Sequence, residues 1–148
     1  MSIRFIATVF FCALNSFAFG QAGPVQEKEI ILLQCTYRES CQTIGSVGFV
    51  KCEGHDRSGS TKISIDKGKR IVQEVGWGRP GSLVETASEY KWTWSQTITL
   101  RWYHYQADLY GAVNSRTGSY THNFVVSISR DNASGQTNTS RTGQCVKG

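Results

Sequence analysis

The 148-residue sequence contains no apolar segment long enough to cross a membrane as a helix, and it contains no long run of charge. Its one continuous apolar stretch, at residues 5–14, spans about ten residues, whereas a membrane-crossing helix needs ~20. No run of basic residues is longer than Lys69-Arg70, and the formal net charge is +5. The short apolar stretch predicts no membrane span. A small positive charge that is spread along the chain keeps a protein soluble, so we expect no nucleic-acid partner.

Signatures of catalysis and of metal binding are also missing. The sequence has no G-x-S-x-G, phosphate-binding-loop or dinucleotide-binding motif, and no H-E-x-x-H. Five residues separate its close cysteine pair, Cys35 and Cys41, and no histidine lies nearby, unlike the C-x-x-C spacing of zinc sites. We therefore expect no metal and no cofactor, and we favour a binding domain over an enzyme.

Residues 1–20 have the pattern of a secretory signal peptide. Arg4 precedes the apolar stretch and small residues follow it at Ala18 and Gly20, which predicts cleavage after Gly20. The mature part, residues 21–148, is then secreted or periplasmic, and its length fits a single domain. Its formal net charge is +4, because the signal peptide carries one basic residue and no acidic one.

Export leaves four cysteines, and an even number in an oxidising compartment predicts two disulfides. We predict a bond between Cys35 and Cys145, because the first and last strands of a barrel or sandwich often meet. Cys41 and Cys52 then form the second bond, and the glycines between them let the chain fold back. The competing pairing, Cys35 with Cys41 and Cys52 with Cys145, stays open at this stage.

Short strands separated by turn signals account for most of the mature sequence. The expected strands cover residues 27–37, both arms of a hairpin at 61–75, residues 107–114 and residues 119–129. A glycine-rich loop is expected at 76–82, and the tetrapeptide SRTG, at 115–118 and again at 140–143, predicts a tight connection in both places. This spacing predicts an all-β fold, a single antiparallel barrel or sandwich of about seven to nine strands stapled by disulfides.

Residues 89–106 form an alternating aromatic stretch. Its even positions from 90 to 104 are Tyr90, Trp92, Trp94, Gln96, Ile98, Leu100, Trp102 and His104, and its odd positions are mostly polar. Because successive side chains of a strand point to opposite faces, we expect one apolar face, with a bend near Ser95 and Gln96. The tryptophans expected in the core are then Trp92, Trp94 and Trp102.

Four residues are candidates for ligand binding. Tyr103 and Tyr105 fall on the polar face beside Arg101, where an exposed aromatic ring can stack on a ligand or on a partner. Trp77 lies between two glycines in the expected loop. We predict that these four side chains contribute to a binding surface.

A polar loop beside Cys52 is the one candidate for catalysis. It contains Glu53, His55 and Asp56, and a histidine flanked by carboxylates can act as a general base. A two-histidine, ribonuclease-like site would combine His55 with His104 or His122. The simpler alternative is that the charged residues solvate a turn.

Residues 130–140 contain no apolar residue except Ala133, so we expect an exposed loop there. This segment holds two N-x-S/T sequons, at Asn132 and Asn138. They matter only in a secretory pathway that attaches N-linked glycans.

Residues 114–120, with Asn114, Arg116, Thr117 and Gly118, are followed by a strand and by the ending Gly143-Gln144-Cys145. This pattern resembles small uncharacterised exported bacterial proteins that have an N-R-x-T-G-like turn and a C-terminal G-x-C. The resemblance covers the last third of the chain, departs from the motif at Ser115, and implies an exported β-rich domain of unknown role.

These observations together predict an exported, non-catalytic β-domain that binds a protein or glycan partner in the cell envelope or outside the cell. Two alternatives stay open. One is a small secreted hydrolase, ribonuclease-like or glycan-directed, that uses His55. The other is an inhibitor or immunity protein for an exported enzyme.

Overall fold

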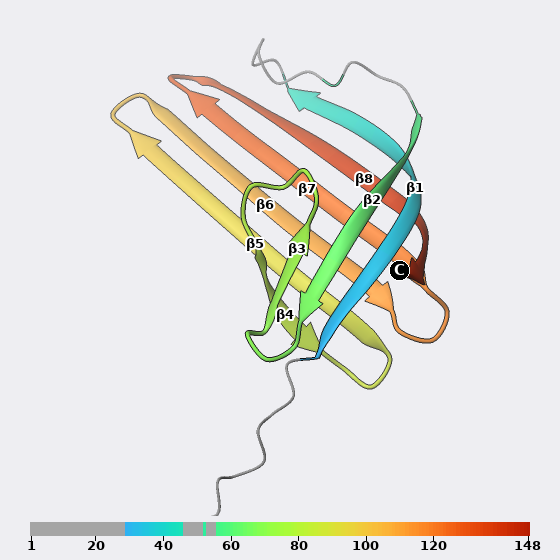
Figure 1. Cartoon of the computed structure of the whole chain (residues 1–148). Coiled ribbons are helices and arrows are strands. Elements are labelled where there is room, and N and C mark those ends of the chain that lie inside the picture. Colours follow the sequence, from blue (N-terminus) through green and yellow to red (C-terminus); the bar gives the residue numbers. More distant parts are fainter. Residues whose placement is uncertain (1–28, 46–51, 53–55) are drawn as a thin grey trace, which may run out of the picture.

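The computed structural model describes residues 29–45, 52 and 56–148, which form one closed antiparallel β-barrel (Figure 1). Its eight strands are β1 (Ile30–Gly45), β2 (Arg57–Asp66), β3 (Ile71–Glu74), β4 (Gly81–Glu85), β5 (Glu89–Leu100), β6 (Tyr103–Asn114), β7 (Ser119–Arg130) and β8 (Ala133–Lys147). Each strand pairs with the next in the sequence, and β8 closes the barrel on β1. The predicted all-β antiparallel fold is confirmed, and it is a barrel. The described residues include no helix that is both long and apolar enough to span a membrane.

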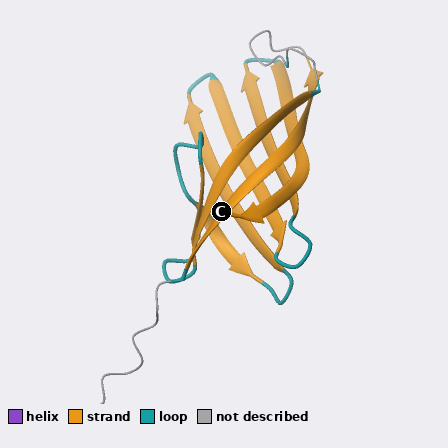
Figure 2. Ribbon diagram, turned by 45° about the vertical axis from the view of Figure 1, so that its right-hand side comes forward, coloured by secondary structure: helices purple, strands orange, loops and turns teal. Residues whose placement is uncertain are grey.

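The barrel is closed along only part of its length, because its strands differ in length. β3 and β4 have four and five residues, whereas β5, β6 and β7 each have twelve. The outer ends of β5 to β8 and of β1 therefore extend beyond the short strands (Figures 1 and 2). We call the part with all eight strands the closed half and the projecting part the open half.

Apolar side chains fill the interior of the closed half. The buried set is Ile31, Leu33, Cys35, Ile63, Ile65, Val72, Leu83, Trp92, Leu109, Val113, Tyr120 and Cys145. Trp92 lies over Gly111 on the neighbouring strand, where a Cβ would overlap the indole ring, so that position requires glycine. Both predicted disulfides are present, Cys35 with Cys145 and Cys41 with Cys52.

The last strand contradicts one expectation from the sequence. Residues 130–140 were expected to form a loop, but the chain turns at Asp131 and Asn132 and β8 starts at Ala133. The second SRTG therefore lies within a strand, whereas the first forms the predicted turn, with Gly118 at a φ of 73°. A polar segment becomes a strand here because β1 and β7 both pair with it, so that tertiary context outweighs composition. Asn132 and Asn138 are both exposed.

The aromatic stretch reverses later than expected. The turn lies at Arg101 and Trp102 instead of near residues 95–96, so the stretch forms two strands. Trp92 is only 2% exposed, as predicted, and Trp94 packs half-buried against the core. The core prediction for Trp102 is wrong, because its place in the turn leaves it 61% exposed.

The two tryptophans lead to a prediction about stability. Trp92→Ala should lower the free energy of unfolding by roughly 3 to 5 kcal/mol, because it leaves a cavity over Gly111. Trp102→Ala should change it by no more than about 0.5 kcal/mol, since the side chain is exposed. Urea unfolding of the two oxidised variants measures both values, and an equal loss in the two would contradict the assignment of the faces.

Candidate functional site

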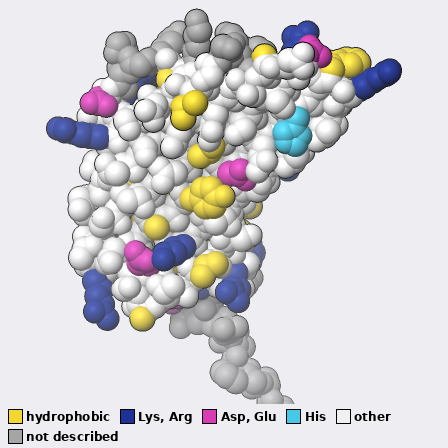
Figure 3. Space-filling view, turned by 180° about the vertical axis from the view of Figure 1, so that it is seen from behind, with side chains coloured by type: hydrophobic (Ala, Val, Ile, Leu, Met, Phe, Trp, Pro, Cys, Tyr) yellow, Lys and Arg dark blue, Asp and Glu magenta, His cyan; other side chains and the backbone are white. Residues whose placement is uncertain are grey.

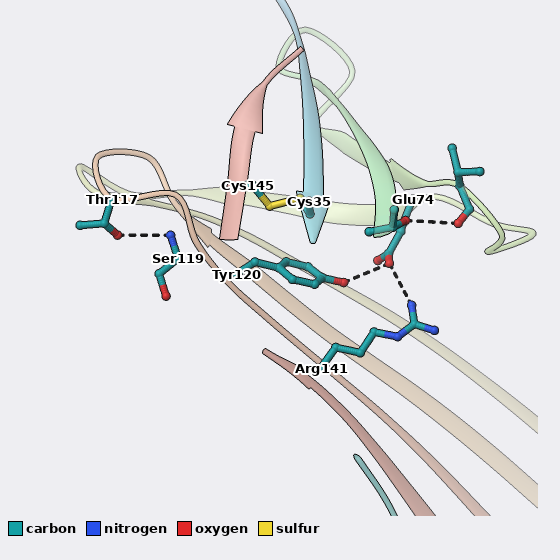
Figure 4. The surroundings of a disulfide bond; sticks show 9 residues. Cys35, Glu74, Thr117, Ser119, Tyr120, Arg141 and Cys145 are labelled. Carbon is teal, nitrogen blue, oxygen red and sulfur yellow. Dashed lines mark hydrogen bonds and ion pairs between the residues drawn. A yellow bond between two sulfur atoms is a disulfide. The ribbon is translucent and has the colours of Figure 1, made fainter. Parts of the chain in front are cut away.

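The barrel interior contains a group of polar side chains at the junction of the closed and open halves. We call this group, Glu39, Glu74, Tyr120, His122 and Arg141, the interior polar cluster. Glu74 is 2% exposed and His122 is 1% exposed, although both side chains are polar. Figure 4 shows Glu74, Tyr120 and Arg141 pointing toward one another near the Cys35–Cys145 disulfide.

Strand alternation and register bring these residues together. Tyr120 and His122 are two positions apart on β7, so they share its inner face. Across the sheet, His122 lies opposite Arg141 on β8, and Arg141 lies opposite Glu39 on β1. Glu74 ends β3 and completes the cluster from the other side of the barrel.

Arg141 bridges the two carboxylates of the cluster. Its Nε donates to Glu39 Oε2 at 2.6 Å, and its Nη1 donates to Glu74 Oε1 at 3.2 Å. The guanidinium carbon also lies 4.5 Å from the centre of the Tyr37 ring, a cation–π distance. The Tyr120 hydroxyl donates to Glu74 Oε1 at 3.0 Å. One guanidinium thus links strands β1, β3 and β8 inside the barrel.

The His122 ring has no hydrogen-bond partner for either nitrogen among the described residues, and the same holds for Glu74 Oε2. Nε2 of His122 lies 3.9 Å from this oxygen, too far for a hydrogen bond. Burial lowers the pKa of His122 to about 4, and the charge of Arg141 acts in the same direction. Burial also raises the pKa of Glu74, against the opposing effects of Tyr120 and Arg141. His122 is therefore neutral at neutral pH.

Trp77 covers the interior polar cluster. Its ring packs edge-on against Phe124 at 4.5 Å and against His122 at 5.2 Å between centroids. Two hydrogen bonds hold its loop, from Gln73 Nε2 to the Trp77 carbonyl at 2.7 Å and from the Trp77 amide to the Glu74 carbonyl at 3.1 Å. The indole therefore packs directly over one edge of the cluster.

Trp77 also lines a hollow of about 250 Å³, which we call the inner hollow. Its lining residues are Trp77, Gly78, Arg79, Trp94, Gln96 and Leu109. No member of the interior polar cluster lines it. A molecule in the inner hollow would therefore meet aromatic and apolar side chains together with Arg79 and Gln96, rather than the buried carboxylates.

The open half presents apolar side chains on its inner surface, which we call the open face. These residues are Ile98, Leu100, Tyr103, Tyr105, Val126 and Ile128. The register sets Ile98 opposite Tyr105 and Leu100 opposite Tyr103. Ile98 is 41% exposed and Leu100 is 58% exposed. The outer surface of β5 to β8 differs, because uncharged polar side chains dominate it (Figure 3).

The four predicted binding residues do not form a single surface. Tyr103 and Tyr105 lie half-buried on the open face, not on the outer polar face, because the turn at residues 101–102 changes which positions point inward. Trp77 lines the inner hollow. Arg101 is exposed in the turn itself.

The predicted polar loop lies mostly outside the described residues, which include neither Glu53 nor His55. Asp56 is described and is exposed just before β2. The other two histidines are far from equivalent. His122 points into the barrel, whereas His104 alternates to the outer face and its Nδ1 lies 3.0 Å from Thr99 Oγ1.

Reasoning from the sequence missed the interior polar cluster. One signal was available for His122, since it alternates with Tyr120 and Phe124, which are aromatic residues on one face of a predicted strand. No such signal existed for Arg141, because its segment was expected to be a connection.

The buried histidine leads to a prediction about pH. Because the pKa of His122 is about 4 in the folded protein and near 6.5 when unfolded, the unfolded chain takes up the proton first as the pH falls. The free energy of unfolding should therefore be highest above pH 6.5 and should fall by up to roughly 3 kcal/mol between pH 6.5 and 4.

The variant His122→Phe keeps an aromatic ring and removes this titration, so its stability should fall less over the same interval. Urea unfolding at several pH values compares the two proteins. Glu74 contributes to the pH dependence of both, so the difference between them reports on His122. Identical pH profiles would show that the histidine does not titrate in this way.

Comparison of this chain with family models, with curated proteins and with solved structures found no match.

Proposed function

We propose that this protein is an exported, non-catalytic β-barrel that binds a partner protein through its open face. The observation that carries the proposal is the exposure of Ile98 and Leu100 on the inner surface, together with Trp102 at the adjoining turn. Apolar side chains that gather at one end of a barrel, instead of being scattered singly, mark an interaction surface. Tyr103 and Tyr105 widen this surface, because they lie opposite Leu100 and Ile98 on the neighbouring strand.

The interior polar cluster supports binding over catalysis. Arg141 already contacts both carboxylates, and Glu74 also accepts a hydrogen bond from Tyr120. In the part of the chain that the structure describes, no hydroxyl or thiol is hydrogen-bonded to His122, as a nucleophile activated by a histidine would be. These contacts are those of a structural ion network.

A hydrolase that uses His55 is the alternative. It depends on a residue outside the described part of the chain, and the described neighbour Asp56 is an exposed side chain before β2. Assays of the mature protein on RNA, peptidoglycan and simple esters address this possibility. Turnover that disappears in the His55→Ala variant would contradict the non-catalytic proposal.

The binding proposal predicts which surface changes matter. The mature chain, used as bait in an extract of the cell envelope and secreted proteins, should capture a partner. The double variant Ile98→Asp and Leu100→Asp should reduce capture at least about tenfold, because it places two charges on a surface that must be desolvated. Quantitative mass spectrometry of the captured proteins measures the change.

The matched control is the double variant Val84→Asp and Val146→Asp. It introduces the same charges at two exposed apolar residues of the closed half. The control should capture the partner as the unmodified chain does, and circular dichroism should show that both variants are folded. Equal loss in the two variants, or no capture by the unmodified chain, would contradict the proposal.

A further inference from the structure

Strand β5 has a free edge in the open half. β4 pairs with β5 only at residues 90–93, although β5 continues to Leu100 and stays paired with β6 along its whole length. Within the described part of the chain, residues 95–100 have no strand on the side away from β6. An unpaired edge of this kind is a template for another strand.

The pairing pattern identifies the free backbone groups. In an antiparallel pair, the N–H and C=O of one residue point to the same side, and the side alternates along the strand. The Leu83 amide donates to Arg70 on the β3 side, so Ser82 points to β5 and meets Thr93, its partner in the register. The odd residues of β5 therefore face the β4 side. Beyond Thr93 these residues are Ser95, Thr97 and Thr99.

The free edge lacks the residues that normally prevent edge pairing. Residues 95–100 read SQTITL, without lysine, proline or any charged side chain. The opposite edge of the open half, on β1, is different. There the Cys41–Cys52 disulfide holds Cys52 beside the strand, and the Cys52 amide donates to Thr43 Oγ1 at 2.8 Å. Among the described residues, no disulfide or hydrogen bond holds another segment against the free side of residues 95–100.

Two hollows flank the free edge where β4 ends. The inner hollow lies on one face of β5. On the other face lies an outer hollow of about 520 Å³, lined by Pro80, Ser82, Thr93, Trp94, Ser95, Asp108 and Tyr110. A strand added to an edge sends alternate side chains to opposite faces. One side chain would enter the inner hollow beside Trp77 and Trp94, and the next would enter the outer hollow beside Ser95 and Asp108.

The charges around the edge favour an added strand with acidic ends over a second copy of this chain. Arg79 lines the inner hollow, Arg101 follows the end of β5, and both are exposed. Among the described residues, neither makes an ion pair. In a symmetric antiparallel pairing of two copies, Arg101 of each copy would approach Arg79 of the other, and these like charges repel. A segment with acidic residues at its ends would instead pair with both.

We propose that the β5 edge at residues 95–100 accepts an extended segment of the partner protein as an additional strand. The segment alternates apolar and polar residues and carries acidic residues at its ends, facing Arg79 and Arg101. This inference rests on the proposed binding function and names the partner's recognition element: about six residues that hydrogen-bond to Ser95, Thr97 and Thr99.

The test uses a synthetic peptide of about eight residues as the probe, with leucine and threonine alternating between acidic ends. Amide hydrogen exchange of the mature, oxidised protein, followed by NMR, reports on each residue. The peptide should slow exchange at Ser95, Thr97 and Thr99 and leave their even-numbered neighbours unchanged. A matched peptide with lysine ends should bind at least about tenfold more weakly.

Thr97→Pro removes a single outward N–H, and an edge strand tolerates proline where the N–H faces away from its paired neighbour. This variant should lose the peptide, whereas Thr97→Val, which keeps the donor and the branched side chain, should bind it. Slow exchange of the even residues in Thr97→Pro would show that β5 and β6 remain paired. The double variant Arg79→Glu and Arg101→Glu should bind the lysine-ended peptide more tightly than the acidic one. This second test leaves the backbone of β5 unchanged.

Three results would overturn strand addition. The first is that the acidic peptide leaves the amides of Ser95, Thr97 and Thr99 unprotected. The second is that the Thr97→Pro variant binds the acidic peptide as the unmodified chain does. The third is that these amides become protected at high protein concentration without peptide, which would indicate pairing with a second copy of this chain. If the partner capture described above depends on Ile98 and Leu100 but not on Thr97, the binding function stands and strand addition fails. If the peptide binds but no partner is captured, the edge site stands and the proposed function fails.

Discussion

The pairing of β1 with β8 closes the barrel. It joins residues 33–45 to residues 135–147 and turns an open sheet into a barrel. The Cys35–Cys145 disulfide lies within this seam and spans 110 positions of sequence. A covalent loop of that length stabilises the folded state by roughly 4 to 5 kcal/mol through the unfolded chain. Without the seam, Arg141 would not lie opposite Glu39 and the interior polar cluster would not form.

The interior polar cluster also helps to explain how a polar strand finds its register. β8 contains few apolar residues, and register is weakly specified where the apolar pattern is weak. Arg141 and Cys145 supply what that pattern lacks, because each has a specific partner on β1. Loss of one partner from such a buried ion network costs about 3 to 5 kcal/mol, since it leaves the other charge unpaired. The cluster thus links the choice of register to stability.

The short strands β3 and β4 give the barrel two halves with different physical properties. In the closed half, every strand has two neighbours and the apolar side chains of the interior are buried. In the open half, Ile98 and Leu100 are exposed, and no described strand pairs with the β4 side of residues 95–100. A free edge favours uncontrolled association unless it serves a partner, which makes it costly to retain without a function.

Several features of the fold follow from the local pattern of residues. These include the hairpin at 61–75, the turn at 115–118, the burial of Trp92 and the all-β class. The structure decided between the two cysteine pairings that the sequence left open. Other features follow from contacts between strands that are distant in the sequence. The turn at residues 101–102 exposed Trp102 and directed Tyr103 inward, because a shift in the turn changes which residues share a face. The interior polar cluster and the free edge depend on which strands become neighbours and where each one ends, and these are long-range relations that no local pattern of residues contains.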